Sequence, residues 1–202
     1  MMDAKLAHKD FSFEFFLYKL IEWYRQSVPS DPQCVSLTRI KILKLLFFTS
    51  VIKTEDGHDL LDIFDNFYAM QHGPVESDIY NSISANQFRF YSFDGISLKL
   101  PSNITDESFD DLDDETKQSI CNSLKELKKV NSRIVGYDPF KLVELSHQWN
   151  SWKRTYEVAG LMGKGSEKMT KLETITAEDL QNRTYEPTHF LADELIPEGL
   201  HI

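Results

Sequence analysis

The chain has few cysteines and no long hydrophobic run. Cys34 and Cys121 are its only cysteines among 202 residues, too few for a secreted disulfide framework and not in a zinc-binding spacing. The first ten residues mix acidic and basic side chains, and the longest apolar run, residues 45–52, is far shorter than a bilayer span. We therefore expect a cytoplasmic protein with reduced thiols, neither exported nor inserted in a membrane.

A surplus of basic residues is also missing. Lys and Arg number 22 against 32 Asp and Glu, for a formal net charge of -10. Because nucleic-acid binding depends on clustered Lys and Arg, this balance argues against a nucleic-acid partner. One stretch has basic residues only, Arg39, Lys41, Lys44 and Lys53. It lacks interleaved aromatic residues, and we interpret it as the solvated face of a helix.

Motifs for metal or nucleotide binding are absent from the sequence. No two of the six histidines are three or four residues apart, the spacing that would place both on one helix face to bind zinc. The glycine-rich residues 160–166 lack the phosphate-loop spacing. The acidic residues 105–115 lack the glycine and final glutamate of a calcium loop, so we expect a solvated loop leading into a helix. We predict neither a metal nor a cofactor, although a site of paired carboxylates stays open.

Helical periodicity of apolar residues dominates the chain. Residues 11–28 form an aromatic-rich amphipathic pattern, and residues 37–54 are apolar on nearly every side, which predicts a helix buried at the centre of the fold. Further helices are predicted over residues 115–130, after Asp138-Pro139 and from Thr176. The helix after Asp138 carries four apolar residues on one side: Leu142, Leu145, Trp149 and Trp152.

Alternating residues around Asp94-Gly95 predict one hairpin, with strands at residues 88–93 and 96–100. The glycine-containing residues 156–170 read as a loop, followed by an acidic C-terminal extension, residues 170–202. We therefore predict a mainly α fold, a compact helical domain of about six to eight helices with one small antiparallel β-hairpin, and a single domain over residues 1–202.

The most informative segment is residues 67–75, an aromatic stretch that runs into Gly73, Pro74 and Val75. Proline suits the first position of a helix, where its missing N–H has no partner to lose, and the acidic side chains that follow favour the positive helix end. A helix is therefore predicted to start at Pro74, with Tyr80 beside its apolar stripe.

Seven short pieces of the sequence carry a resemblance to a known family: residues 44–48, Gly57, residues 67–69, residues 72–75, Tyr80, residues 145–147 and residues 152–153. Together they resemble the Panacea family, the SocA-like antitoxin domain. The resemblance covers residues 37–156, leaving outside it the aromatic helix 11–28 and the acidic extension 170–202. Met70 stands where the family often has Trp, and His72 where it has a basic residue or Tyr.

The resemblance implies a mostly helical, intracellular bacterial or phage-borne protein that binds a toxin directly and is not an enzyme. Two alternatives stay open: a proteolytic adaptor that delivers a partner to a protease, and a hydrolase that uses His72 and His147 as acid and base. Aromatic and histidine side chains would form the docking face. The predicted partner-binding or motif residues are Tyr68, His72, Gly73, Pro74, Val75, Tyr80, His147, Trp149 and Trp152.

Overall fold

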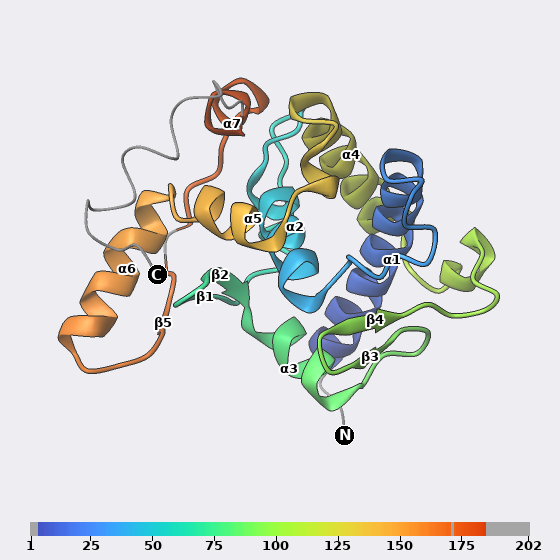
Figure 1. Cartoon of the computed structure of the whole chain (residues 1–202), viewed down its shortest axis with the longest axis horizontal. Helices are drawn as coiled ribbons and strands as arrows, with labels where there is room; N and C mark the ends of the chain where they lie inside the picture. The colour runs from blue at the N-terminus through green and yellow to red at the C-terminus, as the bar shows by residue number, and fades with distance from the viewer. Residues whose placement is uncertain (1–3, 171, 185–202) are drawn as a thin grey trace.

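The computed structural model describes residues 4–170 and 172–184. This part of the chain contains seven α-helices and two small antiparallel sheets, one of three strands and one of two (Figure 1), which confirms the mainly α prediction. None of the described helices is long and apolar enough to cross a membrane. The helices are α1 (Ala4–Ser27), α2 (Arg39–Val51), α3 (Ser77–Ala85), α4 (Asp114–Val130), α5 (Pro139–Ser146), α6 (Asn150–Leu161) and α7 (Ala177–Thr184).

The central position predicted for the second helix is confirmed. From Lys41 to Val51 every residue of α2 is buried, and α1, α4 and α5 lie around it (Figure 1). One part of the prediction was wrong: Lys41 and Lys44 do not face solvent, since their exposed fractions are 2% and 1%. A long aliphatic stem lets a lysine enter an apolar helix pattern, so the charge alone did not reveal the direction of the side chain.

The first helix is longer than predicted and begins at Ala4. Its aromatic side chains pack on Phe109, whose ring centroid lies 5.5 Å from that of Phe11 and 5.2 Å from that of Phe15. The helix also buries polar side chains, including Lys9 and Glu14. The charged residues before Phe11, including Lys9, hid the first turns of the helix in the sequence pattern, because burial of a charge depends on partners that are remote in sequence.

The predicted helix start at Pro74 was wrong. Residues Phe67–Met70 (β1) and Gly73–Glu76 (β2) form an antiparallel hairpin, and β5 (Glu167–Lys168) pairs with the other side of β1. The helix α3 begins only at Ser77, with Glu76 as its N-cap. Pro74 fits an edge strand, where its missing N–H breaks no ladder. The sequence therefore predicted one hairpin where the described residues contain two.

The hairpin around Asp94-Gly95 is confirmed but shorter, with strands β3 (Ser92–Asp94) and β4 (Ser97–Lys99). Residues 88–91 are not in the strand. A carboxylate oxygen of Glu14 on α1 accepts hydrogen bonds from the backbone N–H groups of Phe90 and Tyr91. A remote side chain thus replaces the strand partner that the alternating pattern implied.

The C-terminal half follows the predictions for α4 and α7 and departs from them between the two. Asp113 caps α4 by accepting the N–H of Thr116, and the acidic residues before it form a short 3-10 turn, Asp106–Phe109. The helix after Asp138 breaks at His147 and resumes as α6, which runs to Leu161, so the loop predicted from residue 156 was wrong. Most of the acidic extension, residues 185–202, lies outside the described residues.

The buried hydrophobic residues of the described part form one cluster with members from all seven helices. Trp149 joins several of them: its ring lies edge-on to Phe47, at a centroid distance of 5.1 Å, and the guanidinium of Arg183 lies over it at 4.6 Å. The cluster therefore links α2, the break between α5 and α6, and α7. The single domain over residues 1–202 stays a prediction.

Candidate functional site

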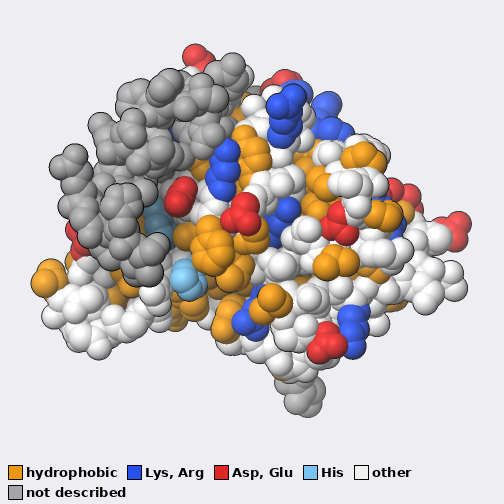
Figure 2. All heavy atoms as spheres, in the orientation of Figure 1, with side chains coloured by type: hydrophobic (Ala, Val, Ile, Leu, Met, Phe, Trp, Pro, Cys, Tyr) orange, Lys and Arg blue, Asp and Glu red, His pale blue; other side chains and the backbone are white. Residues whose placement is uncertain are grey.

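The β1–β2 hairpin forms one wall of a pocket of about 360 Å³, which we call the hairpin pocket. Other walls come from α2, from Tyr80 of α3 and from Gly165 and Ser166. In the view of Figure 2, hydrophobic side chains gather beside histidine side chains, where Figure 1 places α5 and the hairpin. The residues that line the pocket are Arg39, Ile40, Leu43, Lys44, Met70, Gln71, His72, Val75, Tyr80, Gly165 and Ser166.

Gly73 lets the hairpin approach α2 and α5 closely. Its φ is +86°, and a Cβ built on it would overlap the Ser146 hydroxyl oxygen and lie 3.0 Å from Nζ of Lys44. Glycine is the residue that combines a positive φ with such a close approach. The Gly-Pro step therefore sets the distance between the hairpin and two helices, rather than the start of a helix.

Lys44 is buried directly beneath this contact. Its ammonium donates a hydrogen bond of 2.6 Å to the backbone carbonyl of Pro74. Burial lowers the pKa of Lys44 to about 7, because the charged form loses its hydration and gains no carboxylate partner. Lys44 thus fixes β2 to α2 and contributes to the wall of the hairpin pocket.

His147, Trp152 and Tyr156 form a stack behind the hairpin. The rings of His147 and Trp152 are 3.9 Å apart and nearly parallel, and Tyr156 continues the stack at 5.2 Å. The indole N–H of Trp152 donates to the backbone carbonyl of Met70 at 3.0 Å. The stack therefore holds the end of β1 against α6 and supports the turn that carries His72.

The ionisation of His147 is strongly suppressed. Burial, followed by the nearby Lys44, lowers the pKa of His147 to about 4, with a hydrogen bond to the Gln71 backbone acting in the opposite direction. Its Nε2 atom is buried and has no hydrogen-bond partner among residues 4–170 and 172–184. A neutral ring with an inaccessible nitrogen favours packing over proton transfer.

Acid is therefore expected to destabilise the protein through His147. The folded-state pKa lies below the ordinary value of 6.5, so unfolding takes up a proton, and stability falls as pH decreases from about 6.5 to about 4. A His147→Phe variant keeps a stacking ring and removes this titration. Urea unfolding at each pH should show a smaller loss for the variant than for the wild type. Equal losses would contradict this account of His147.

The predicted site residues fall into two groups. His72, Val75 and Tyr80 line the hairpin pocket, and Gly73 lies against Lys44 and His147. His72 is exposed, while Tyr80 is half-buried with the guanidinium of Arg39 over its ring at 5.1 Å. The remaining residues do not line the pocket. Tyr68 and Pro74 lie in the strands of the hairpin. His147 and Trp152 stack behind it, and Trp149 is fully buried.

Arg39, Met70 and Lys44 are pocket residues whose role sequence reasoning missed. Lys44 was part of the family pattern but was interpreted as a solvated charge. The absence of any acidic residue between Gln33 and Lys53 was the available signal, because a charge without a nearby counter-charge is notable when the helix around it is apolar throughout.

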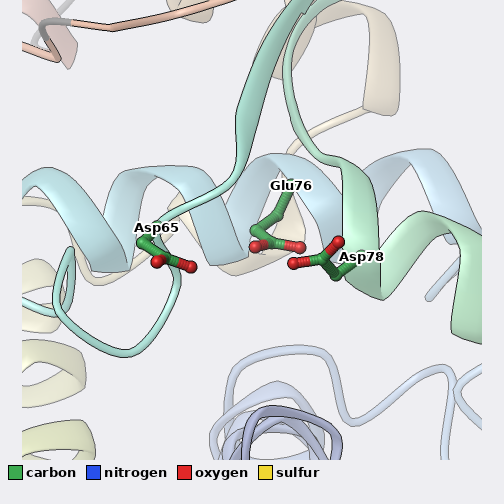
Figure 3. Close-up of side chains that lie close together, drawn as sticks. All are labelled: Asp65, Glu76 and Asp78. Carbon is green, nitrogen blue, oxygen red and sulfur yellow. The ribbon is translucent and has the colours of Figure 1, made fainter. Parts of the chain in front are cut away.

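A second polar cluster lies between α1, the hairpin and α3. Carboxylates of Asp65, Glu76 and Asp78 point toward one another (Figure 3), with one oxygen of each within 4.8 Å of the others. Such a set can bind a metal ion, but here the ammonium of Lys9 lies 2.5–2.8 Å from all three. Glu76 also accepts the N–H groups of Asn66 and Ile79. Lys9 supplies the positive charge, so the cluster joins three elements without a metal.

Comparison with known proteins gave one result. The family model described as Antitoxin SocA-like, Panacea domain matches residues 42–153, more than half of the chain. A search of curated proteins and a search of solved structures gave no match. The matched residues include most of α2, both hairpins, and α3 to α5, and they contain Lys44, Gly73, Tyr80 and His147. The chain therefore belongs to the SocA-like antitoxin family defined by the Panacea domain.

Proposed function

We propose that this protein binds a toxin protein directly and neutralises it by occlusion, with the hairpin pocket and its rim as the docking face. The observation that carries the proposal is that segments of the matched family region far apart in sequence meet at this pocket. They are α2 with Lys44, the hairpin with residues 70–72 and Val75, and α3 with Tyr80. Binding of this kind needs a complementary surface and no chemical step.

The composition of the pocket suits protein recognition. Ile40, Leu43, Met70 and Val75 offer apolar area, while Tyr80 and Arg39 are of the residue types that dominate binding energy at interfaces. Methionine adapts to different partner shapes because its side chain is unbranched and flexible. The rigid support beneath the turn, from the stack at His147 and Trp152, limits the ordering cost of docking.

Charge supports a basic partner at longer range. The net charge of -10 would accelerate encounter with a positively charged toxin, without setting the affinity of the complex. The charge of the whole surface would therefore affect the rate of association, while the pocket would determine which partner is bound.

The proposal is tested by co-expression. Genes adjacent to this one in its host are expressed in bacteria alone and together with this protein, and growth is measured. We expect one product to be lethal alone and tolerated in the presence of the protein. Tyr80→Ala should weaken the rescue of growth, because it removes an aromatic side chain that lines the pocket, whereas Tyr137→Ala should not. Tyr137 is a matched control, since it is half-buried outside the pocket with Lys141 over its ring at 4.1 Å.

The same strains distinguish occlusion from delivery to a protease. If the toxin is occluded, its level stays constant while growth recovers, and the complex can be purified. A toxin level that falls when this protein is present would instead support the adaptor function. Absence of any toxic neighbour, or a toxic neighbour that the folded protein does not counteract, would contradict the proposal.

A further inference from the structure

We propose that the hairpin pocket recognises a carboxylate of the partner protein, carried by an acidic side chain or a chain end next to an apolar residue, with Lys44 as its counter-ion. This inference deepens the proposed function and rests on it for the identity of the molecule that carries the carboxylate. It stands on the surroundings of Lys44 and on the charge of the pocket.

The ammonium of Lys44 is incompletely satisfied. Its exposed fraction is 1%, and its hydrogen bond to the carbonyl of Pro74 is one of the three that an ammonium can donate. Within the described residues no carboxylate forms an ion pair with Lys44. Buried charges are normally paired, as Lys9 of the same protein is with three carboxylates. The described part of the free protein therefore contains a buried cationic group without a carboxylate partner.

The pocket around Lys44 is positive although the protein is acidic. Among the described residues, its lining includes the basic side chains of Arg39 and Lys44 and contains no Asp or Glu, in a chain with 32 acidic residues. A negative group that enters meets attraction from the wall and the rim and no repulsion from the lining. Most of the remaining wall is apolar, so it favours a ligand with one charge on an apolar body over a strongly hydrated phosphate.

The acid–base state of Lys44 agrees with this geometry. In the free protein, burial lowers its pKa to about 7, so that near neutral pH the ammonium readily loses its proton. A carboxylate within hydrogen-bond distance stabilises the charged form. The protonated lysine, whose side chain is almost fully buried, and the ligand then satisfy each other.

The test uses a small carboxylate and its neutral counterpart. N-acetyl-leucine, which mimics a protein chain end, and N-acetyl-leucine amide are titrated into the full chain while backbone amide signals are followed by NMR. We expect saturable shifts at Gln71 and Gly73 with the carboxylate only. Lys44→Met should weaken carboxylate binding by about tenfold or more, because an uncompensated carboxylate would enter the pocket.

Lys41→Met is the matched control. Lys41 is also buried on α2, but its ammonium lies over the ring of Tyr24, at 5.0 Å, and it does not line the pocket. This variant should bind the carboxylate as the wild type does. Equal binding of carboxylate and amide by the wild type would overturn the inference, and this comparison needs no variant. Undiminished binding by folded Lys44→Met would overturn it too.

The rescue assay separates this inference from the proposed function. If the protein neutralises its toxin but shows no preference for the carboxylate, the proposed function stands and the role of Lys44 as a counter-ion is overturned. A protein that prefers the carboxylate but rescues no toxin loses the proposed function, and with it the partner protein as the source of the carboxylate.

Discussion

Replacement of Lys9 by methionine is expected to lower the free energy of unfolding by about 3–5 kcal/mol, the cost of leaving buried charges without their partner. Methionine retains most of the length of the side chain and removes the ammonium. Asp65 would keep its ion pair with the exposed Lys5, but Glu76, which is fully buried, and Asp78 would lose the ammonium that faces them. Urea denaturation of the wild type and the variant at neutral pH measures the difference.

The ionisation of the cluster supplies a second readout. Although burial raises the pKa of Asp65, hydrogen bonds from Lys5 and Lys9 lower it to about 2 in the wild type. Without Lys9 the clustered carboxylates repel one another and bind protons more tightly than they do in the unfolded chain. The deficit of the variant should therefore shrink as pH decreases, because protonation then favours its folded state.

Lys5→Met is the matched control for this experiment. Lys5 also pairs with Asp65, at 2.5 Å, but 66% of its side chain is exposed. Exposed ion pairs contribute little, so the control should lose at most about 1 kcal/mol. A Lys9 variant that unfolds at the same urea concentration as the wild type would show that the cluster does not hold α1, the hairpin and α3 together.

Replacement of Gly73 by alanine is expected to cost about 3 kcal/mol or more, the combined effect of backbone strain and a buried clash. The new Cβ would overlap the hydroxyl oxygen of Ser146 and press on Nζ of Lys44, so the hairpin must move away from α2 and α5. Because the hairpin is a wall of the pocket, rescue of toxin-expressing cells should weaken together with stability.

Gly57→Ala isolates the backbone component of that cost. Gly57 has nearly the same φ, +85°, and a Cβ there would meet no atom within 4 Å. Its replacement should cost only the strain of the left-handed conformation, about 1–2 kcal/mol. Unfolding free energies of the two variants, measured in urea, give the steric part by difference. Equal costs would contradict the close approach of Gly73 to the helices.

A double variant tests the named contact directly. Ser146 donates its hydroxyl hydrogen to the carbonyl of Val143 in its own helix, so Ser146→Ala alone removes one local hydrogen bond. If the hydroxyl oxygen is the main obstacle, Gly73→Ala should be less damaging in the Ser146→Ala background than in the wild type. Strictly additive costs would mean that the strain lies elsewhere around the turn.

The sequence predicted those parts of the fold that depend on local pattern. The buried centre at α2, the capped starts of α4 and α7, and the turn at Asp94-Gly95 each carry their signal in a few adjacent residues. The start at Pro74 was wrong because Gly-Pro is compatible with both a helix start and an edge strand. The choice between them depends on Ser146 and Lys44, which lie far away in sequence.

In the candidate site, too, the sequence predicted features that depend on local pattern and missed those that depend on contacts between distant segments. The family pattern identified the hairpin residues and Tyr80, but it could not show that Lys44 is buried without a carboxylate or that Trp149 is buried in the core. The pairing of Lys9 with Asp65, Glu76 and Asp78 joins residues more than fifty positions apart. No local period encodes such a contact, because it arises only when α1 packs against the hairpin.

The dependence of the hairpin on α1 has a practical consequence for mapping the smallest active fragment. The family match begins at residue 42, after the helix that supplies Lys9 and the rings packed on Phe109. A chain cut to the matched boundaries would expose the hydrophobic surface that α1 covers. It would also leave the carboxylates of Asp65, Glu76 and Asp78 to repel one another. Family boundaries here mark where relatives share sequence, and a fragment able to fold must begin before Lys9.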